Sequence, residues 1–315
     1  MTEQKTVFSH YPVMLGECIE GLNIRPDGIY ADCTLGGGGH SEQIAKRLTT
    51  GRLICIDQDI CAIEASRERL APYAGRITFV HDNFRNIRDI LDRLSVPSID
   101  GALIDLGVSS YQLDTPERGF SYQYDARLDM RMDQGAALSA YEVVNTYSYE
   151  DLRRIISDYG EERFAPRIAS GIVKKRESAP VSTTFDLVDI IKSAIPAKNR
   201  AESGHPAKRT FQAIRIEVNS ELSIIEPTVK SLVSVLSPGG RLCVLTFHSL
   251  EDRIVKQTFL NEAKGCTCPP DFPVCVCGKT PNVRVLTHKP VTASEKELNE
   301  NNRSHSAKLR ICERL

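Results

Sequence analysis

One stretch near the start of the chain constrains the fold more than any other. An apolar run begins at Tyr30, four glycines follow at 36–39, and after a helical segment a second apolar run ends at Asp57. Glycine permits positive φ and close approach of the backbone to a ligand, and the next helix offers free N–H groups at its start. Asp57 lies 21 positions after Gly36, the spacing at which an acidic residue binds ribose hydroxyls. We therefore predict a nucleoside-cofactor site.

Apolar runs of strand length recur along the chain, with helical segments between them. The runs cover residues 29–33, 52–56, 76–80, 99–106 and 241–247. Within 84–94, apolar residues follow the i, i+3, i+4, i+7 spacing of a helix. This alternation predicts an α/β fold with a parallel, Rossmann-like sheet and right-handed crossovers.

Four acidic residues end successive strands of this predicted sheet: Asp32, Asp57, Asp82 and Asp105. Ligands of open α/β sheets bind outside the carboxyl ends of the strands, so these carboxylates are candidate ligand contacts. The alternative, which applies mainly to Asp32 and Asp82, is that they cap the helices that follow.

The glycine loop favours S-adenosylmethionine over NAD. A dinucleotide loop needs a third Gly or Ala for helix–strand packing, but this position falls on Ser41 or Glu42. A loop that serves one adenosyl group has no pyrophosphate to bind. After the third strand, Asp82 could accept from an adenine amine and Phe84 could stack on the base.

The strand repeat breaks after Gly107. We predict an inserted helical domain over 114–205, with a discontinuous main domain formed by 1–113 and 206–315. Helices are expected at 148–159, 163–176 and 184–195, and one long helix kinked at Pro227 over 208–236. From Gly160 to Arg215 there are 11 Lys and Arg against 6 Asp and Glu, on a chain of net charge −1. Beside a ligand site, this surplus favours a polyanionic substrate.

Asp105 is the candidate catalytic residue. An aromatic amine is a poor nucleophile because its lone pair is delocalised into the ring. An acceptor for its N–H would help to localise that lone pair for attack on a methyl group. Asp105 could be that acceptor, with Ser109 or Ser110 nearby, or it could contact the cofactor instead.

The motifs together resemble one family. DCTLGGGGHS, LIDLGVSSYQLD, YGEERFAPRIA, HPAKRTFQAIRIEVNSEL and PGGRLCVLTFHSLEDRIVK occur in order to near the C-terminus. They are similar to the ribosomal small-subunit RNA methyltransferase H family, also called MraW. The resemblance implies a class I methyltransferase sheet with an inserted all-helical domain. It also implies methylation by S-adenosylmethionine of N4 of a cytidine in the decoding region of small-subunit (16S) rRNA.

The same resemblance implies which residues contact the cofactor. These are Gly38, Gly39, His40, Asp57, Phe84, Asp105 and Gln112. Asp105-Leu106-Gly107-Val108 stands where amine methyltransferases usually carry an acidic or polar residue, two prolines and an aromatic ring, so the catalytic assignment stays open.

Two further segments are candidates for contact with RNA. One contains Arg209 and Arg215, and the other, after the fifth strand, contains His248 and Arg253. The alternative is that they cap helices or form ion pairs. Tyr111, Phe120 and Tyr122 are candidates to stack on a target base that has left its helix.

Four cysteines form a C-x-C-x6-C-x-C run: Cys266, Cys268, Cys275 and Cys277. They could bind zinc, although C-x-x-C is the more usual spacing, and the alternative is a loop of reduced thiols. The other six cysteines are scattered singly, as in a chain without structural disulfides.

The N-terminal segment carries no signal-peptide pattern, and no apolar run approaches the length of a membrane span. We expect a cytoplasmic protein without a membrane partner. The oligomeric state is open, with a homodimer as one option. The rival functions are methylation of DNA or another RNA, and a non-catalytic RNA-binding or ribosome-assembly factor.

Overall fold

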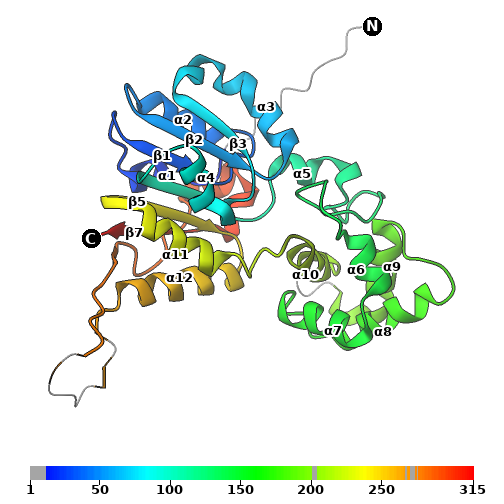
Figure 1. Cartoon of the computed structure of the whole chain (residues 1–315). Helices are drawn as coiled ribbons and strands as arrows, with labels where there is room; N and C mark the ends of the chain where they lie inside the picture. The colour runs from blue at the N-terminus through cyan, green and yellow to red at the C-terminus, as the bar shows by residue number, and fades with distance from the viewer. Residues whose placement is uncertain (1–11, 201–203, 267, 270–273, 275) are drawn as a thin grey trace, which may run out of the picture. The chain divides into compact units, whose positions relative to one another are not determined.

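The computed structural model describes residues 12–200, 204–266, 268–269, 274 and 276–315 (Figure 1). They form two compact units. The first contains residues up to 107 together with 225–315, and the second contains 108–224. Each unit has its own hydrophobic core.

The first unit is built on a seven-stranded sheet with the order β3-β2-β1-β4-β5-β7-β6. The strands are β1 (Ile29–Asp32), β2 (Arg52–Asp57), β3 (Ile77–His81), β4 (Ile99–Asp105), β5 (Leu236–Thr246), β6 (Val283–Val285) and β7 (Lys308–Arg314). Strands β1 to β5 are parallel, as predicted, whereas β7 runs antiparallel to both β5 and β6. The Rossmann-like class I sheet is confirmed.

Helices cover both faces of this sheet (Figure 1). They are α1 (Leu15–Leu22), α2 (Gly39–Arg47), α3 (Ile60–Leu70), α4 (Ile87–Arg93), α11 (Ile225–Val235), α12 (Ser249–Ala263) and α13 (Glu295–Glu300). On one face α2 contacts α1 and α3, and on the other α11 contacts α4 and α12. This arrangement brings the loops that follow the parallel strands to one edge of the sheet.

The second unit is helical. It contains α5 (Ser110–Asp114), α6 (Ala140–Thr146), α7 (Tyr149–Asp158), α8 (Ala165–Arg176), α9 (Thr184–Ala194) and α10 (Lys208–Asn219). Hydroxyl side chains cap several of these helices, as Ser139 does at α6 and Thr183 at α9. Among the described helices of both units, none is long and apolar enough to cross a bilayer.

The expected long helix over 208–236 is wrong. The chain forms α10 and α11 as separate helices, because Ser220 adopts a left-handed conformation (φ 53°) and ends α10. Pro227 does not kink a helix; it lies in the first turn of α11, where its missing N–H has no partner to lose. Phe211 and Ile214 of α10 pack into the helical core, so the second unit is larger than the predicted insertion at both ends.

Candidate functional site

The carboxyl edge of the parallel strands carries the predicted acidic residues. Asp32, Asp57 and Asp105 are the last residues of β1, β2 and β4, and Asp82 directly follows β3. Strand β1 lies between β2 and β4, where the strand order reverses. This is the switch point at which open α/β sheets bind ligands.

The glycine loop is fastened to the end of β2. The Leu35 N–H donates to the Ile56 carbonyl (3.0 Å), and the Gly36 N–H donates to Oδ2 of Asp57 (2.8 Å). Gly38 precedes α2 with a φ of 73°, in the left-handed region that favours glycine. The loop therefore presents bare backbone and the start of α2 at this edge.

Each carboxylate oxygen of Asp57 accepts one hydrogen bond from the protein backbone. Its Oδ2 accepts from Gly36, and its Oδ1 accepts from the Asp59 N–H (2.9 Å). Burial raises its pKa to about 6, against the lowering effect of these two N–H groups. Above that pH both oxygens are carboxylate oxygens that keep a free lone pair. A pair of ribose hydroxyls fits this remaining capacity.

Asp32 and Asp82 are engaged by their own neighbours. Asp32 is buried and accepts from the Ser41 hydroxyl (2.6 Å) and the Thr34 N–H (3.2 Å), which fixes the start of α2. Asp82 accepts from Asn86 (2.7 Å) and Arg93. Although burial acts to raise it, these two partners hold the pKa of Asp82 below its ordinary value. The contacts of both carboxylates support the alternative in which they organise the following helices.

Asp105 differs from the other three carboxylates. Its main-chain N–H donates to the Thr34 hydroxyl (2.7 Å), but its Oδ1 is buried with no hydrogen-bond partner among the described residues. The side chain as a whole is 28% exposed. Burial, followed by the charges of Asp32 and Glu251, raises its pKa to about 8. An unpartnered buried carboxylate oxygen is costly, so this atom is suited to a donor supplied by a ligand.

His40 stands beside Asp105. Its Nδ1 lies 3.9 Å from Oδ2 of Asp105, and its Nε2 lies 3.2 Å from the Val13 carbonyl. Burial lowers its pKa to about 4, so the ring is neutral at pH 7. Because the carbonyl can only accept, Nε2 carries the proton and Nδ1 is an acceptor. Above about pH 8, where Asp105 is ionised, two acceptors face each other without a proton between them, an arrangement that suits an ammonium or amine group.

The remaining predicted cofactor residues lie in two places. Phe84 is buried in the 3-10 turn after Asp82. Gln112 belongs to the helical unit, where its side-chain carbonyl accepts from the Ser109 N–H (3.0 Å) as part of the cap of α5. The cofactor role that the family resemblance implies for Gln112 stays a prediction.

The residues predicted to contact RNA differ in their partners within the protein and in their exposure to solvent. Arg215 forms a two-pronged ion pair with Glu221 (2.9 Å for each contact), and Nδ1 of His248 accepts from the Glu251 N–H (3.5 Å) at the start of α12. Arg253 is exposed on α12. Arg209 is also exposed and donates to the Glu161 carbonyl (2.9 Å). The capping and ion-pair alternative accounts for Arg215 and His248.

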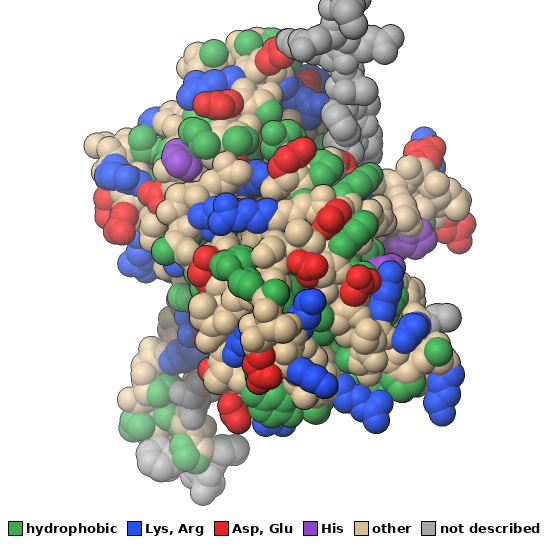
Figure 2. Space-filling view, turned by 90° about the vertical axis from the view of Figure 1, so that its right-hand side faces the viewer, with side chains coloured by type: hydrophobic (Ala, Val, Ile, Leu, Met, Phe, Trp, Pro, Cys, Tyr) green, Lys and Arg blue, Asp and Glu red, His purple; other side chains and the backbone are tan. Residues whose placement is uncertain are grey.

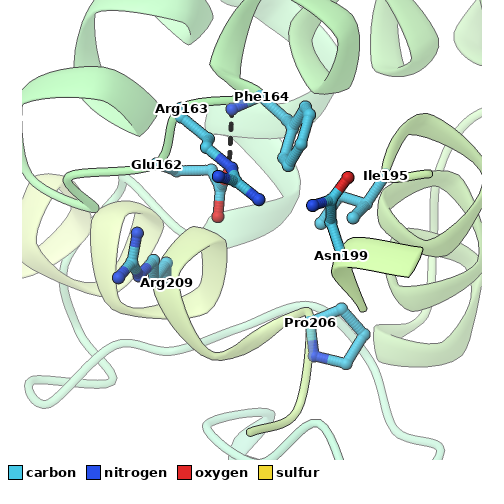
Figure 3. Close-up of a pocket in the computed structure, with 7 residues that line it drawn as sticks. All are labelled: Glu162, Arg163, Phe164, Ile195, Asn199, Pro206 and Arg209. Carbon is cyan, nitrogen blue, oxygen red and sulfur yellow. Dashed lines mark hydrogen bonds between the residues drawn. The ribbon is translucent and has the colours of Figure 1, made fainter. Parts of the chain in front are cut away.

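Arg209 lines a pocket of about 190 Å³ in the helical unit (Figure 3). The other lining residues are Glu162, Arg163, Phe164, Ile195, Asn199 and Pro206. The Arg163 guanidinium lies 4.8 Å from the centre of the Phe164 ring. Two guanidinium groups and an aromatic ring are the groups that phosphates and bases contact. Sequence reasoning missed Arg163, although it belongs to the YGEERFAPRIA motif.

Of the predicted stacking residues, only Tyr111 offers an open ring. Its side chain is 48% exposed, whereas Phe120 is buried. Tyr122 already stacks on His205, with ring centres 4.4 Å apart.

Replacing Asp105 with Asn should stabilise the ligand-free protein in a pH-dependent way. Folding raises this pKa from 3.8 to about 8, so the unfolded chain releases its proton first and the native state loses stability as pH rises between these values. The gain from Asp105→Asn should be near zero at pH 4 and largest above pH 8, with the melting temperature rising about 2–4 °C per kcal/mol gained. Thermal unfolding from pH 4 to 9 measures it, and a gain independent of pH would contradict the assignment.

Known proteins match this chain along nearly its whole length. A family model described as the MraW methylase family matches residues 7–315. Proteins named ribosomal RNA small subunit methyltransferase H are 58% identical in Lachnospira eligens, covering 98% of each chain, and 54% identical in Clostridioides difficile, covering 98% of this chain and 99% of the relative. A solved rRNA methylase from Streptococcus thermophilus is 11% identical, with a TM-score of 0.41 over 96% of this chain and 93% of that one. The chain belongs to the MraW methylase family.

Proposed function

We propose that this protein transfers a methyl group from S-adenosylmethionine to N4 of a cytidine in the decoding region of small-subunit rRNA. The observation that carries the proposal is the unpartnered Oδ1 of Asp105, placed beside neutral His40 at the edge that holds the glycine loop. The names of the relatives point to the same class of RNA substrate.

The residues at this edge fit the parts of the cofactor. The Asp57 carboxylate would accept the ribose hydroxyls, and the glycine loop would lie against the nucleoside with no side chain between them. Phe84 would contact the adenine. The acceptors on His40 and Asp105 suit the cofactor's amino group. When bound, the sulfonium supplies an electrophilic methyl group and a neutral leaving group.

Asp105 would handle the proton of the substrate amine. As the N–CH3 bond forms and the S–CH3 bond breaks, N4 must lose one proton. The Asp105 carboxylate can accept the N4–H hydrogen bond, orient the nitrogen lone pair and then take that proton. Its raised pKa of about 8 makes it a better proton acceptor than an ordinary carboxylate, once it is ionised. The same residue can hold the cofactor, and the experiments below separate these roles.

The helical unit would bind the RNA. It contains most of the segment with surplus basic residues, and its pocket combines Arg163, Arg209 and the ring of Phe164. Figure 2 shows Lys and Arg side chains gathering toward the lower right of one face, whereas elsewhere on that face acidic and basic side chains are mixed. Contacts of this kind bind phosphates without reading sequence.

The direct test incubates the protein with methyl-labelled S-adenosylmethionine and small ribosomal subunits from cells that lack it. The RNA is then digested and the modified nucleoside identified. We expect label in N4-methylcytidine at one position. Cofactor binding without label would favour a ribosome-assembly factor, and label gained only by DNA or another RNA would identify the rival substrate.

Asp57→Ala should weaken cofactor binding about 10–100-fold, because bonds from two hydroxyls to a charged group would be lost. Calorimetric titration with S-adenosylmethionine measures the change. Asp57→Asn is the matched control for loop structure, since its amide oxygen can still accept from Gly36, and it should lose less affinity. Unchanged binding in Asp57→Ala would contradict the ribose assignment.

If Asp105 acts on the amine, Asp105→Asn should keep cofactor affinity and lose turnover.

Arg163→Ala and Arg209→Ala should each weaken RNA binding similarly for all sequences and reduce the slope of log K against log salt by about 1. Binding to small-subunit rRNA fragments across a salt series measures this. Lys296→Ala, which removes one exposed positive charge from α13 in the other unit, is the charge-matched control. A slope that falls equally in all three variants would remove the pocket from the RNA-binding surface.

A further inference from the structure

The segment between α12 and β6, residues 264–282, has no regular secondary structure among its described residues. Two apolar side chains among its described residues are exposed: Val274 is 69% exposed and Val276 is 73% exposed. Long connections without secondary structure are uncommon in compact domains, and the exposed valines of this one add little hydrophobic stabilisation.

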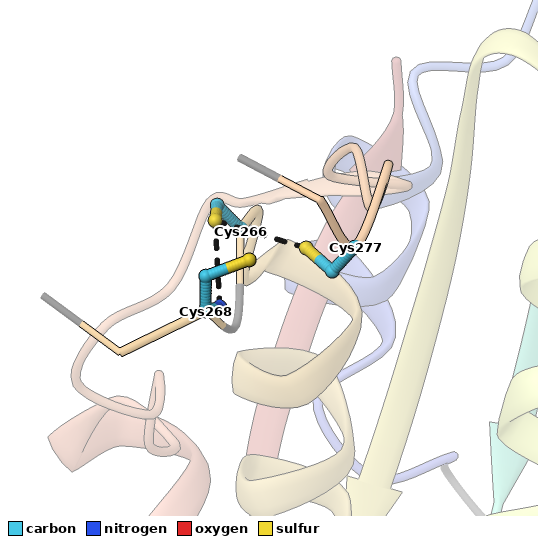
Figure 4. Close-up of side chains that lie close together, drawn as sticks. All are labelled: Cys266, Cys268 and Cys277. Atoms are coloured by element: carbon cyan, nitrogen blue, oxygen red, sulfur yellow. Dashed lines mark hydrogen bonds between the residues drawn. The ribbon is translucent and has the colours of Figure 1, made fainter. Parts of the chain in front are cut away.

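Three thiols converge within this segment (Figure 4). The Sγ atoms of Cys266, Cys268 and Cys277 all lie within 4.8 Å of one another, and those of Cys266 and Cys277 are 3.7 Å apart. A disulfide would need about 2.05 Å. Zinc binds thiolates at about 2.3 Å in a tetrahedron, which places its sulfur ligands about 3.8 Å from one another. The Cys266–Cys277 separation is thus that of two ligands on one zinc ion.

Backbone donors surround the sulfur atoms. The Cys268 N–H donates to Sγ of Cys266 (3.4 Å), and the Val276 N–H donates to Sγ of Cys268 (3.4 Å). Such donors fix the orientation of the sulfur atoms that would face a metal ion.

Five of the six other described cysteines have a different environment. Cys18, Cys33, Cys55, Cys243 and Cys312 are buried. Burial raises the pKa of each of these thiols, that of Cys243 to about 12. They behave as small apolar core residues. Cys266 and Cys277 are exposed and Cys268 is half-buried, so these three thiols are not part of an apolar core.

We propose that Cys266, Cys268 and Cys277 bind one zinc ion that holds this segment in place. Three thiolates leave one tetrahedral position for a further ligand. Cys275, also predicted from the sequence as a zinc ligand, lies outside the described residues. The site is structural, because α12 separates it from the cofactor edge. The helix begins after His248, just beyond the carboxyl end of β5, and its 15 residues extend about 22 Å before the segment starts.

Metal analysis of full-length protein purified under reducing conditions tests the proposal. We expect about one zinc per chain. Cys266→Ser and Cys277→Ser should lose most of it, whereas Cys61→Ser, which removes a thiol from α3, should keep it. Cobalt loaded in place of zinc should give the strong visible bands of tetrahedral cobalt–thiolate. Wild-type protein with less than about 0.2 zinc per chain, iron in place of zinc, or full zinc retention in both loop variants would overturn the assignment.

A second readout separates structure from catalysis. Lys264 and Lys279 flank the thiols and are exposed, so trypsin should cut there faster after a chelator has removed the metal. Cofactor affinity should stay within about twofold, because the metal lies at the far end of α12. Cleavage unaffected by the chelator, or a large loss of cofactor binding, would overturn the structural role. None of these outcomes depends on the proposed methyl transfer.

Discussion

The hydrogen bond from the Gly36 N–H to Asp57 is the contact on which the candidate site depends. It joins the loop after β1 to the end of β2, and the Thr34 hydroxyl joins the same loop to β4 through the Asp105 N–H. Three neighbouring strands thereby hold one loop. A loop so restrained presents its backbone to a ligand without first losing conformational entropy, which is how a preorganised site gains affinity.

The four acidic residues share one position on successive strands, yet their surroundings give them different capacities. Asp32 and Asp82 accept hydrogen bonds from neighbouring side chains. Each oxygen of Asp57 keeps one free lone pair, and Asp105 has an oxygen with no partner among the described residues. The unused hydrogen-bonding capacity, rather than the presence of a carboxylate, indicates where a ligand binds. The unpartnered oxygen of Asp105 is also a cost to the stability of the ligand-free protein.

Much of this fold follows from the sequence, because parallel strands buried on both faces are continuous apolar runs and the acidic residues mark their ends. The end of α10 at Ser220 does not follow from the sequence, because no local pattern indicates a serine with positive φ. Pro227 instead suggests a kink at its own position. The break at Ser220 allows Glu221 to turn back onto Arg215, because residues six positions apart in a continuous helix would point to different sides. Strand β7 was missed because charged residues alternate with its apolar ones. The neutral His40 and the unpartnered Asp105 oxygen depend on tertiary burial, which no local pattern encodes.

The position of β7 has a consequence for how the chain folds as it is made. This strand comes last in the sequence but lies inside the sheet, between β5 and β6. The helical unit, residues 108–224, is contiguous and is complete long before β7 is synthesised. During translation the helical unit can therefore fold first, while β5 keeps an open edge that only the final strand closes.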